Sequence, residues 1–343
     1  MRRGSVFFIV IMMLAVVLTT IGCGNASDVI PAMGEDSPEA ILAAAMTSAQ
    51  DMTSAAGSFS LTMEYDFDTT GMPEEMRAYF EEPMTVAGTF ASGTDPQTAD
   101  LELALTMGGE TMDVGIKLMG DKGWMRMLDQ WYEAPSEMMS GSTYDEAQIA
   151  EMIRLMNELG VDPATWFKDL TLVGEEAVEE VAAYHLSGTP DLAKVLADVI
   201  GLMESDEFMD LVDPDGMMTE SLGEGMFAIS ADELQEAQDQ VTSMFKDLKV
   251  DAWIAKDGNT LRKADVIAHV TPPEDEDSGG LNAIDLNVGL LITGTNQPVT
   301  VEPPASALPY EALEKALTEN PEMFMGPFMA LGGMGFGDAG YEY

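Results

Sequence analysis

Cysteine is almost absent from this chain of 343 residues, and Cys23 is the only one. A single cysteine cannot form a disulfide within the chain, and it cannot supply a thiolate metal site of the kind that binds zinc. The folded part of the chain therefore depends for its stability on a buried apolar core. Since 46% of the residues are apolar, the chain is able to bury one large core or two modest ones.

Histidine is nearly as rare, with only His185 and His269. Two histidines on separate predicted strands do not suit a histidine-based triad or a three-histidine metal site, and they are expected to be satisfied surface residues. The chain has no Gly-x-Ser-x-Gly elbow and no phosphate loop. The glycines of 335–340 match the spacing of a dinucleotide-binding loop, but that loop has to follow a strand, and no strand is predicted before them. The acidic run 275–277 lacks the glutamate at the twelfth position of a calcium loop. We expect no catalytic residue, metal or cofactor, although the many acids leave open a carboxylate pair such as glycoside hydrolases use.

Basic residues are scarce: 15 Lys and Arg stand against 61 Asp and Glu, for a net charge of −46. A chain this acidic is repelled by phosphate backbones, which excludes nucleic acid as a partner. An anionic membrane surface repels it too, so membrane attachment has to depend on a lipid and not on a basic patch. The acidity is typical of a solvated surface suited to salt.

An export signal is present at the start of the chain. Arg2 and Arg3 precede an unbroken apolar run, Val6 to Leu18, and small and polar residues follow up to Cys23. The run is shorter than the about 20 apolar residues that a membrane-spanning helix needs. Residues 1–22 are therefore predicted to be a cleaved signal peptide.

The residues around the cysteine, Thr20-Ile21-Gly22-Cys23-Gly24, resemble a bacterial lipobox. The resemblance implies that the thiol of Cys23 becomes a thioether to diacylglycerol and anchors the exported chain on the outer face of the cell membrane, or on the outer membrane in a cell with two. Ordinary cleavage that leaves a free thiol is the alternative. Residues 23–37 are small and polar, which suits a flexible tether.

The hydrophobic period predicts a helix followed by a run of strands. Ser37 and Pro38 begin a helix of about five turns, since they supply a cap and a proline at the first helical position. From Phe59 the period changes to two, which indicates a strand with one buried face. The same alternation and short connections predict an antiparallel meander, apolar on one face, through 84–90, 101–107, 112–118 and 122–132.

The rest of the pattern mixes helices with strands. Helices are expected at 145–159, from a Thr189 cap through 192–199, at 230–248 and at 310–317, and strands at 182–186, 250–254, 261–270 and 284–292. The acidic, methionine-rich segment 204–229 is expected to be an insertion loop with low order. The Gly/Met/Phe-rich segment 319–343 is expected to be a mobile tail.

Two local stretches resemble recurring features of a known group of proteins. One leads into a helix and consists of Ala183-Tyr184-His185-Leu186-Ser187-Gly188-Thr189. The other leads into a strand and consists of Val250-Asp251-Ala252-Trp253-Ile254-Ala255-Lys256-Asp257-Gly258. With the lipobox, the first helix and the strands, the chain resembles the LppX/LprA/LprF/LprG lipoproteins, which are similar to the LolA/LolB carriers. The resemblance implies an α+β fold at 38–318. In that fold a curved, partly closed antiparallel sheet (a half-barrel) has helices over its concave face and an apolar cavity between the two layers.

The resemblance also implies a function: a membrane-anchored envelope lipoprotein that binds and carries a lipid or a lipidated molecule. Carriage requires no catalytic residue. Alternating apolar residues of the strands are the candidates for lining the cavity, and a solid core would use the same residues: Phe59, Leu61, Met63, Tyr65, Val86, Phe90, Leu103, Leu105, Val114, Ile116, Ile284, Leu286, Val288 and Leu290. The alternative function is an envelope lipid sensor or regulatory module, with 204–229 and the tail as docking surfaces for a membrane protein partner. A structural or adhesive surface protein is a third class.

Overall fold

The computed structural model describes residues 37–70, 77, 80–94, 97–127, 129–135, 146–212, 231–272 and 280–319. The predicted signal peptide, Cys23, nearly all of the tether and of the tail, and most of the acidic insertion lie outside these ranges.

Eleven antiparallel strands form one sheet in the order β6-β5-β4-β3-β2-β1-β11-β10-β9-β8-β7, with β6 and β7 at its edges. Their bounds are β1 (Ser54–Phe67), β2 (Met84–Thr94), β3 (Gln97–Met107), β4 (Glu110–Met119), β5 (Lys122–Met127), β6 (Gln130–Ala134), β7 (Thr171–Val178), β8 (Val181–Gly188), β9 (Lys249–Ala255), β10 (Leu261–Val270) and β11 (Leu281–Thr295). The predicted α+β class, an antiparallel sheet accompanied by helices, is confirmed.

The chain divides into two compact units. The wide-sheet unit (Thr53–Thr143 and His269–Tyr343) contains β1 to β6 and β11, and the helical unit (Met1–Met52 and Tyr144–Ala268) contains β7 to β9 and most of β10.

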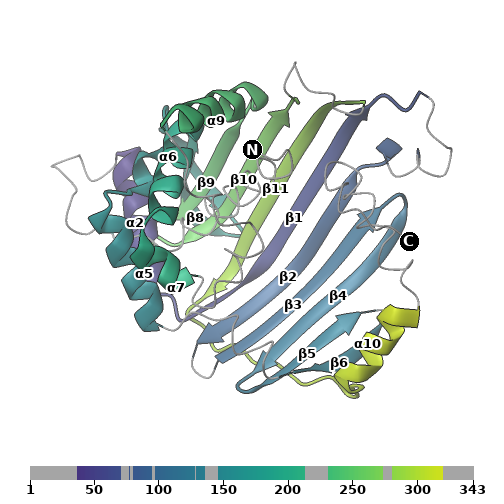
Figure 1. The fold of residues 1–343 in the computed structure, drawn as a ribbon. Coiled ribbons are helices and arrows are strands. Elements are labelled where there is room, and N and C mark those ends of the chain that lie inside the picture. The colour runs from purple at the N-terminus through teal and green to yellow at the C-terminus, as the bar shows by residue number, and fades with distance from the viewer. Residues whose placement is uncertain are drawn as a thin grey trace. The chain divides into compact units, whose positions relative to one another are not determined.

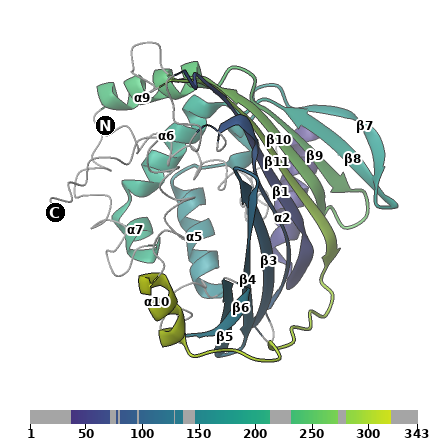
Figure 2. The same cartoon turned by 90° about the vertical axis from the view of Figure 1, so that its right-hand side faces the viewer.

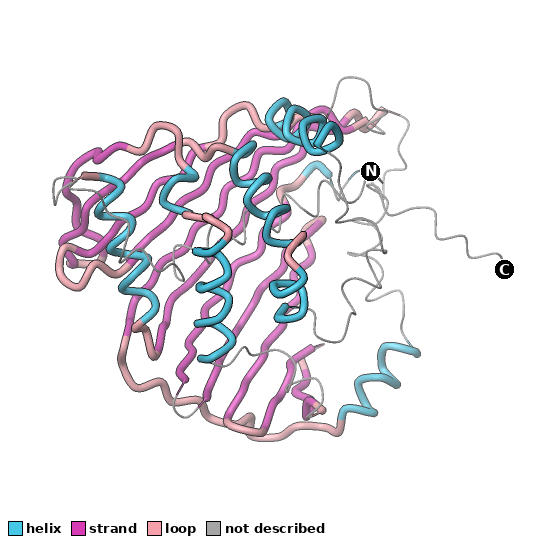
Figure 3. Tube along the Cα trace, turned by 60° about the vertical axis from the view of Figure 1, so that its left-hand side comes forward, coloured by secondary structure: helices cyan, strands magenta, loops and turns pink. Residues whose placement is uncertain are grey.

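The strands of the wide-sheet unit form the predicted meander, and Figure 3 shows them running side by side. The prediction of one strand over 122–132 is wrong, because β5 and β6 are separate strands that pair with each other. Asp129, at the turn between them, has a φ of 59°. Aspartate tolerates this left-handed conformation, which reverses the chain here.

One helix with defined bounds, α10 (Tyr310–Glu319), belongs to the described part of the wide-sheet unit, and it buries Leu313. It contacts the edge strand β6, beside which it lies in Figure 1. The backbone just before it is tied to the same strand, because Leu308 N donates to Trp131 O at 2.9 Å and Glu133 N donates to Leu308 O at 2.8 Å. These bonds occupy backbone groups that an edge strand otherwise leaves free.

The helical unit has five α-helices and a short 3-10 helix among its described residues: α2 (Pro38–Gln50), α5 (Glu146–Glu158), η1 (Pro163–Trp166), α6 (Leu192–Met203), α7 (Asp206–Val212) and α9 (Ala231–Met244). The pair α6 and α9 lies side by side, as Figures 1 and 2 both show. Among the described residues, no helix is long and apolar enough to span a membrane.

Local caps explain where these helices begin and end. The hydroxyl of Ser37 accepts from Ala40 N at 3.2 Å, which confirms the predicted start of α2. The predicted cap of α6 is wrong: Asp191, and not Thr189, accepts from Lys194 N at 3.3 Å. Within the segment expected as a loop, Asp206–Val212 are helical, and 213–230 lie outside the described residues.

Candidate functional site

One face of the sheet in the wide-sheet unit is apolar from strand to strand. Leu61 lies opposite Val86 on β2 and opposite Val288 on β11. Directly paired residues of antiparallel strands project from the same face. The pairs continue through β3 and β4, so the register places all fourteen predicted lining residues on one side, which we call the apolar face.

The opposite side of the same strands carries polar and charged residues. Asp100 pairs with Lys117 at 2.6 Å, and Glu102 pairs with Arg126 at 2.6 Å. The indole of Trp131 has Lys117 Nζ and the Arg126 guanidinium each 5.6 Å from its ring centroid. Polar residues on one side and apolar residues on the other are the alternation expected of an antiparallel sheet with one solvated face.

The apolar face is incompletely buried. Of the fourteen residues, only Met63 and Ile284 are buried, and the other twelve are half-buried. The helical unit provides an internal comparison: Leu186, Ile254 and Val266, on the apolar side of β8, β9 and β10, are each at most 1% exposed. The helical unit therefore has a solid core, whereas the wide sheet has apolar side chains that the described residues do not fully cover.

A buried cluster closes one end of the apolar face. Met63, Met84, Met107 and Ile284 form it, where β1 and β3 end and where β2 and β11 begin. Phe80 lies at the same end, stacked on Phe67 with ring centroids 4.7 Å apart. Unbranched methionines pack readily against such irregular neighbours.

Tyr65 is the polar exception in this cluster. Its hydroxyl lies 3.9 Å from Met63 Sδ and 3.9 Å from Met84 Sδ, and its ring packs edge-on against Phe80 with centroids 6.3 Å apart. Burial raises the pKa of this hydroxyl to about 12. The group is therefore a neutral hydrogen-bond donor throughout the physiological range of pH.

Two glycines let aromatic rings lie flat on the apolar face. Gly57 pairs with Phe90, and Phe59 pairs with Gly88. A Cβ at Gly88 would lie 2.3 Å from Glu102 O and 3.0 Å from the Phe59 ring, and one at Gly57 would lie 2.9 Å from the Phe90 ring. Each ring thus occupies the space over the opposite glycine, an arrangement that compensates for the missing side chain.

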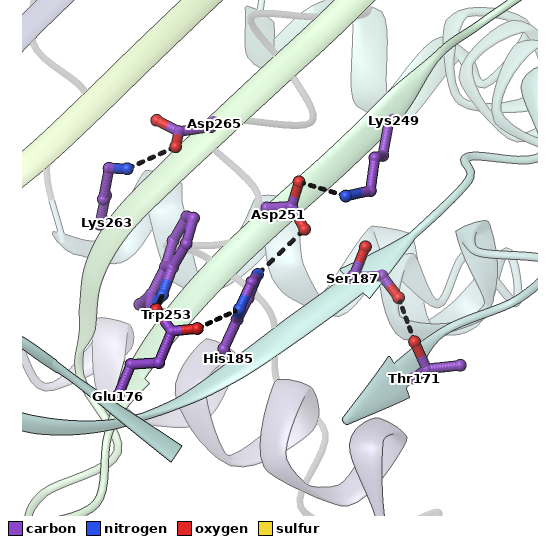
Figure 4. Close-up of polar contacts among 9 residues, drawn as sticks. All are labelled: Thr171, Glu176, His185, Ser187, Lys249, Asp251, Trp253, Lys263 and Asp265. Atoms are coloured by element: carbon purple, nitrogen blue, oxygen red, sulfur yellow. Dashed lines mark hydrogen bonds and ion pairs between the residues drawn. The ribbon is translucent and has the colours of Figure 1, made fainter. Parts of the chain in front are cut away.

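A polar cluster occupies one side of the sheet in the helical unit, and Figure 4 shows its members. His185 on β8 is placed between two carboxylates: its Nδ1 lies 3.0 Å from Glu176 Oε1 and its Nε2 lies 3.0 Å from Asp251 Oδ1. The imidazole stacks on Trp253, whose Nε1 donates to Glu176 Oε2 at 3.1 Å. Two carboxylates facing both ring nitrogens suit the imidazolium, which has an N–H on each nitrogen.

Two lysines complete this cluster. Lys249 Nζ lies 2.9 Å from Asp251 Oδ2, and Lys263 Nζ lies 4.2 Å from the centroid of the Trp253 ring. Burial acts to raise the pKa of Asp251, but hydrogen bonds from Lys249, His185 and Ser187 outweigh it and hold that pKa below its usual value. Hydrogen bonds from Trp253 and His185 likewise lower the pKa of Glu176.

These contacts join the cluster into one network. Among the described residues, no hydrogen bond joins the Ser187 hydroxyl to His185, which is the base-to-nucleophile contact of a hydrolase triad. His269 is also paired, with its Nδ1 2.7 Å from Asp285 Oδ1. In the part of the chain that the structure describes, no group of three or more His, Cys, Asp or Glu is arranged to hold a metal ion.

Sequence reasoning found the apolar face and missed the network around His185. The alternation along each strand predicts the apolar face, because side chains two residues apart share a face of the sheet. Glu176 lies on the neighbouring strand of the same hairpin, and Asp251 is 66 residues from His185. Both approach His185 through the pairing of β7, β8 and β9.

Comparison with known proteins was made at three levels. No family model matches the chain, and neither does any curated protein. Among solved structures, the lipoprotein LppX of Mycobacterium tuberculosis is 13% identical, over 77% of this chain and 98% of that one, with a TM-score of 0.34. LprF from Mycobacterium bovis is 12% identical, over 78% and 97%, with a TM-score of 0.36.

MucB, solved in complex with MucA(peri), is 13% identical over 76% of this chain and 56% of its own, with a TM-score of 0.23. LppX and LprF belong to the group that the sequence resembles. At these identities and TM-scores the likeness carries no argument about a role, a ligand or a partner for this chain.

Proposed function

We propose that this chain is an exported envelope lipoprotein, anchored through a lipid on Cys23, that binds and carries a lipid or a lipidated molecule. In this proposal the apolar face is one wall of an apolar cavity, and residues 38–318 are the lipid-binding domain. The observation that carries the proposal is the contrast in burial: twelve of the fourteen residues on the apolar face are half-buried, whereas the core of the helical unit is closed.

The size of the apolar face suits an acyl ligand. Across five strands, from β4 to β11, it measures about 19 Å, and from Phe59 to Tyr65 along β1 it measures about 20 Å, by the usual spacings of a sheet. The resulting footprint is about 400 Å², most of it made of half-buried side chains.

The energetics explain why a lipid requires such a protein. Each methylene removed from water contributes about 0.8 kcal/mol, so a two-chain lipid with about 30 methylenes lies more than about 20 kcal/mol above its membrane state when it is free in water. A protein wall that matches the apolar environment of the bilayer lowers that cost. Transfer then needs binding and release alone, with no bond made or broken.

The proposal is tested by identifying what the purified protein contains. A form of the protein that begins after Cys23 is used, so that no covalent anchor is present. It is isolated with mild detergent and extracted with organic solvent, and the extract is analysed by mass spectrometry. We expect a lipid at close to one molecule per chain. Protein that is consistently empty, and that takes up no lipid from vesicles, would contradict the proposal, and a stable membrane protein partner in its place would favour a sensor.

A further inference from the structure

Among the described residues, the Tyr65 hydroxyl is a hydrogen-bond donor that meets only weak acceptors. Its two contacts there, both at 3.9 Å, are the thioether sulfurs of Met63 and Met84. Thioether sulfur accepts hydrogen bonds poorly. Buried tyrosine hydroxyls usually find a stronger partner, and a donor that does not find one loses part of its hydration without full compensation.

The position of this hydroxyl relates it to the proposed ligand. Tyr65 projects from β1 on the apolar face, two residues beyond Met63 and opposite Ile284. The half-buried stretch of the face begins one and two rows before this pair, at Leu286 opposite Met63 and at Leu61 opposite Val288. A chain lying along the face from Leu290 toward Ile284 therefore runs toward the closed end at which the Tyr65 hydroxyl lies.

The surroundings of the hydroxyl indicate which kind of hydrogen-bond acceptor can lie beside it. None of the described side chains that the register places on the apolar face is basic, and the neighbours of the hydroxyl at this end are Met63, Met84 and the Phe80 ring. Arg77, three residues before Phe80, already has an interaction of its own. A carboxylate or phosphate buried there would meet no counter-charge from the strands of the face, which is costly. A neutral acceptor, such as the carbonyl oxygen of an ester or amide, needs only the one donor.

We infer that Tyr65 is a specificity-determining residue of the lipid site: its hydroxyl donates a hydrogen bond to a neutral acyl carbonyl oxygen at the end of the bound chain. The inference depends on the proposed function, since it assigns a polar contact within that same site. The high pKa of Tyr65 is consistent with it, because the hydroxyl keeps its proton at neutral pH.

The test compares two ligands that differ in the carbonyl group. A diacylglycerol and the dialkylglycerol ether of the same chain length are competed against an environment-sensitive fluorescent probe on wild-type protein and on Tyr65→Phe. One hydrogen bond in an apolar site corresponds to roughly a three- to tenfold change in affinity. We expect the ratio of diester to diether affinity to fall by that factor in Tyr65→Phe.

Tyr132→Phe is the matched control. Tyr132 is buried on β6, opposite Met125, and β6 is five strands from β1 in the sheet, a separation of about 24 Å. We expect this variant to keep the wild-type ratio. Because the described residues give the Tyr65 hydroxyl only sulfur contacts, Tyr65→Phe is expected to fold with a melting temperature equal to or above that of the wild type.

The outcomes separate the two proposals. If both lipids bind and Tyr65→Phe leaves the ratio of affinities unchanged, the role of Tyr65 is wrong and lipid binding stands. If the ratio falls equally in Tyr132→Phe, the effect does not belong to Tyr65 and the inference is overturned. If neither lipid displaces the probe from wild-type protein, the proposed function fails and the inference fails with it.

Discussion

The imidazole of His185 lies flat against the indole of Trp253, with ring centroids 4.3 Å apart and ring planes inclined by 16°. The two residues are directly paired between β8 and β9. Stacking and the two carboxylate contacts fix the ring from its face and from both of its edges.

The first prediction concerns pH and the carboxylates that hold this ring. The pKa values of Asp251 and Glu176 are lowered in the folded protein from 3.8 and 4.5. A lowered folded pKa gives stability that is present above the unfolded pKa and is lost as the pH falls through the folded value. The contribution of these two carboxylates to the free energy of unfolding is therefore expected to be constant above about pH 5 and to decline below about pH 4. It is measured as the difference between the wild type and the Asp251→Asn variant, by urea titration at each pH.

The second prediction removes one of these carboxylates. Asp251→Asn replaces an ionised acceptor of His185 and Lys249, and we expect it to lower the free energy of unfolding at pH 7 by about 1–3 kcal/mol and to flatten the acid limb. Asp285→Asn is the control, since Asp285 is 64% exposed where it faces His269, and exposed pairs are worth about 0–1 kcal/mol. Equal losses in the two variants would show that the network around His185 contributes no more to the free energy of unfolding than an exposed pair does.

The third prediction concerns the glycine beneath Phe59. Gly88→Ala would place a Cβ 2.3 Å from Glu102 O, so β2 and β3 would have to separate. We expect a loss of about 1–3 kcal/mol or more in the free energy of unfolding. Gly174→Ala on β7 is the matched control, because its Cβ meets nothing within 4 Å. A Gly88→Ala protein as stable as this control would show that the strands accommodate the methyl group.

The sequence predicts most of the elements, because period-two and helical patterns reflect which side chains point toward the core. It misses β7, where Glu175 and Glu176 break the alternation on an edge strand. It merges β5 and β6, since only the left-handed φ of Asp129 separates them. The sequence cannot distinguish a solid core from an incompletely covered face, because Leu61 and Ile254 are both aliphatic residues in an alternating strand. The structure shows that Leu61 is half-buried and Ile254 is fully buried.

The fourth prediction concerns the anchor. Cys23 is the only cysteine, so Cys23→Ala removes the sole site for a thioether-linked lipid. We expect the variant to be exported but soluble, or to be retained with its signal peptide, and the two forms differ in mass. The form without the signal peptide is expected to leave the detergent phase in a partitioning assay. Unchanged partitioning of that form would rule out the lipid anchor at this position.

The central claim is that the apolar face holds a lipid, and Val288 lies in its middle, opposite Leu61. Its counterpart in the closed core of the helical unit is Val266, which is 0% exposed. Val266→Trp is expected to overpack and to lose about 1–3 kcal/mol or more. At Val288 the indole has room if the space above the face belongs to a ligand.

The most direct test measures lipid content and melting temperature on the same sample of Val288→Trp, beside the wild type and Val266→Trp. We predict that Val288→Trp binds clearly less lipid than the wild type and keeps a melting temperature close to it, while Val266→Trp melts much lower. A Val288→Trp protein that is as destabilised as Val266→Trp, with no lipid in the wild type either, would contradict the account.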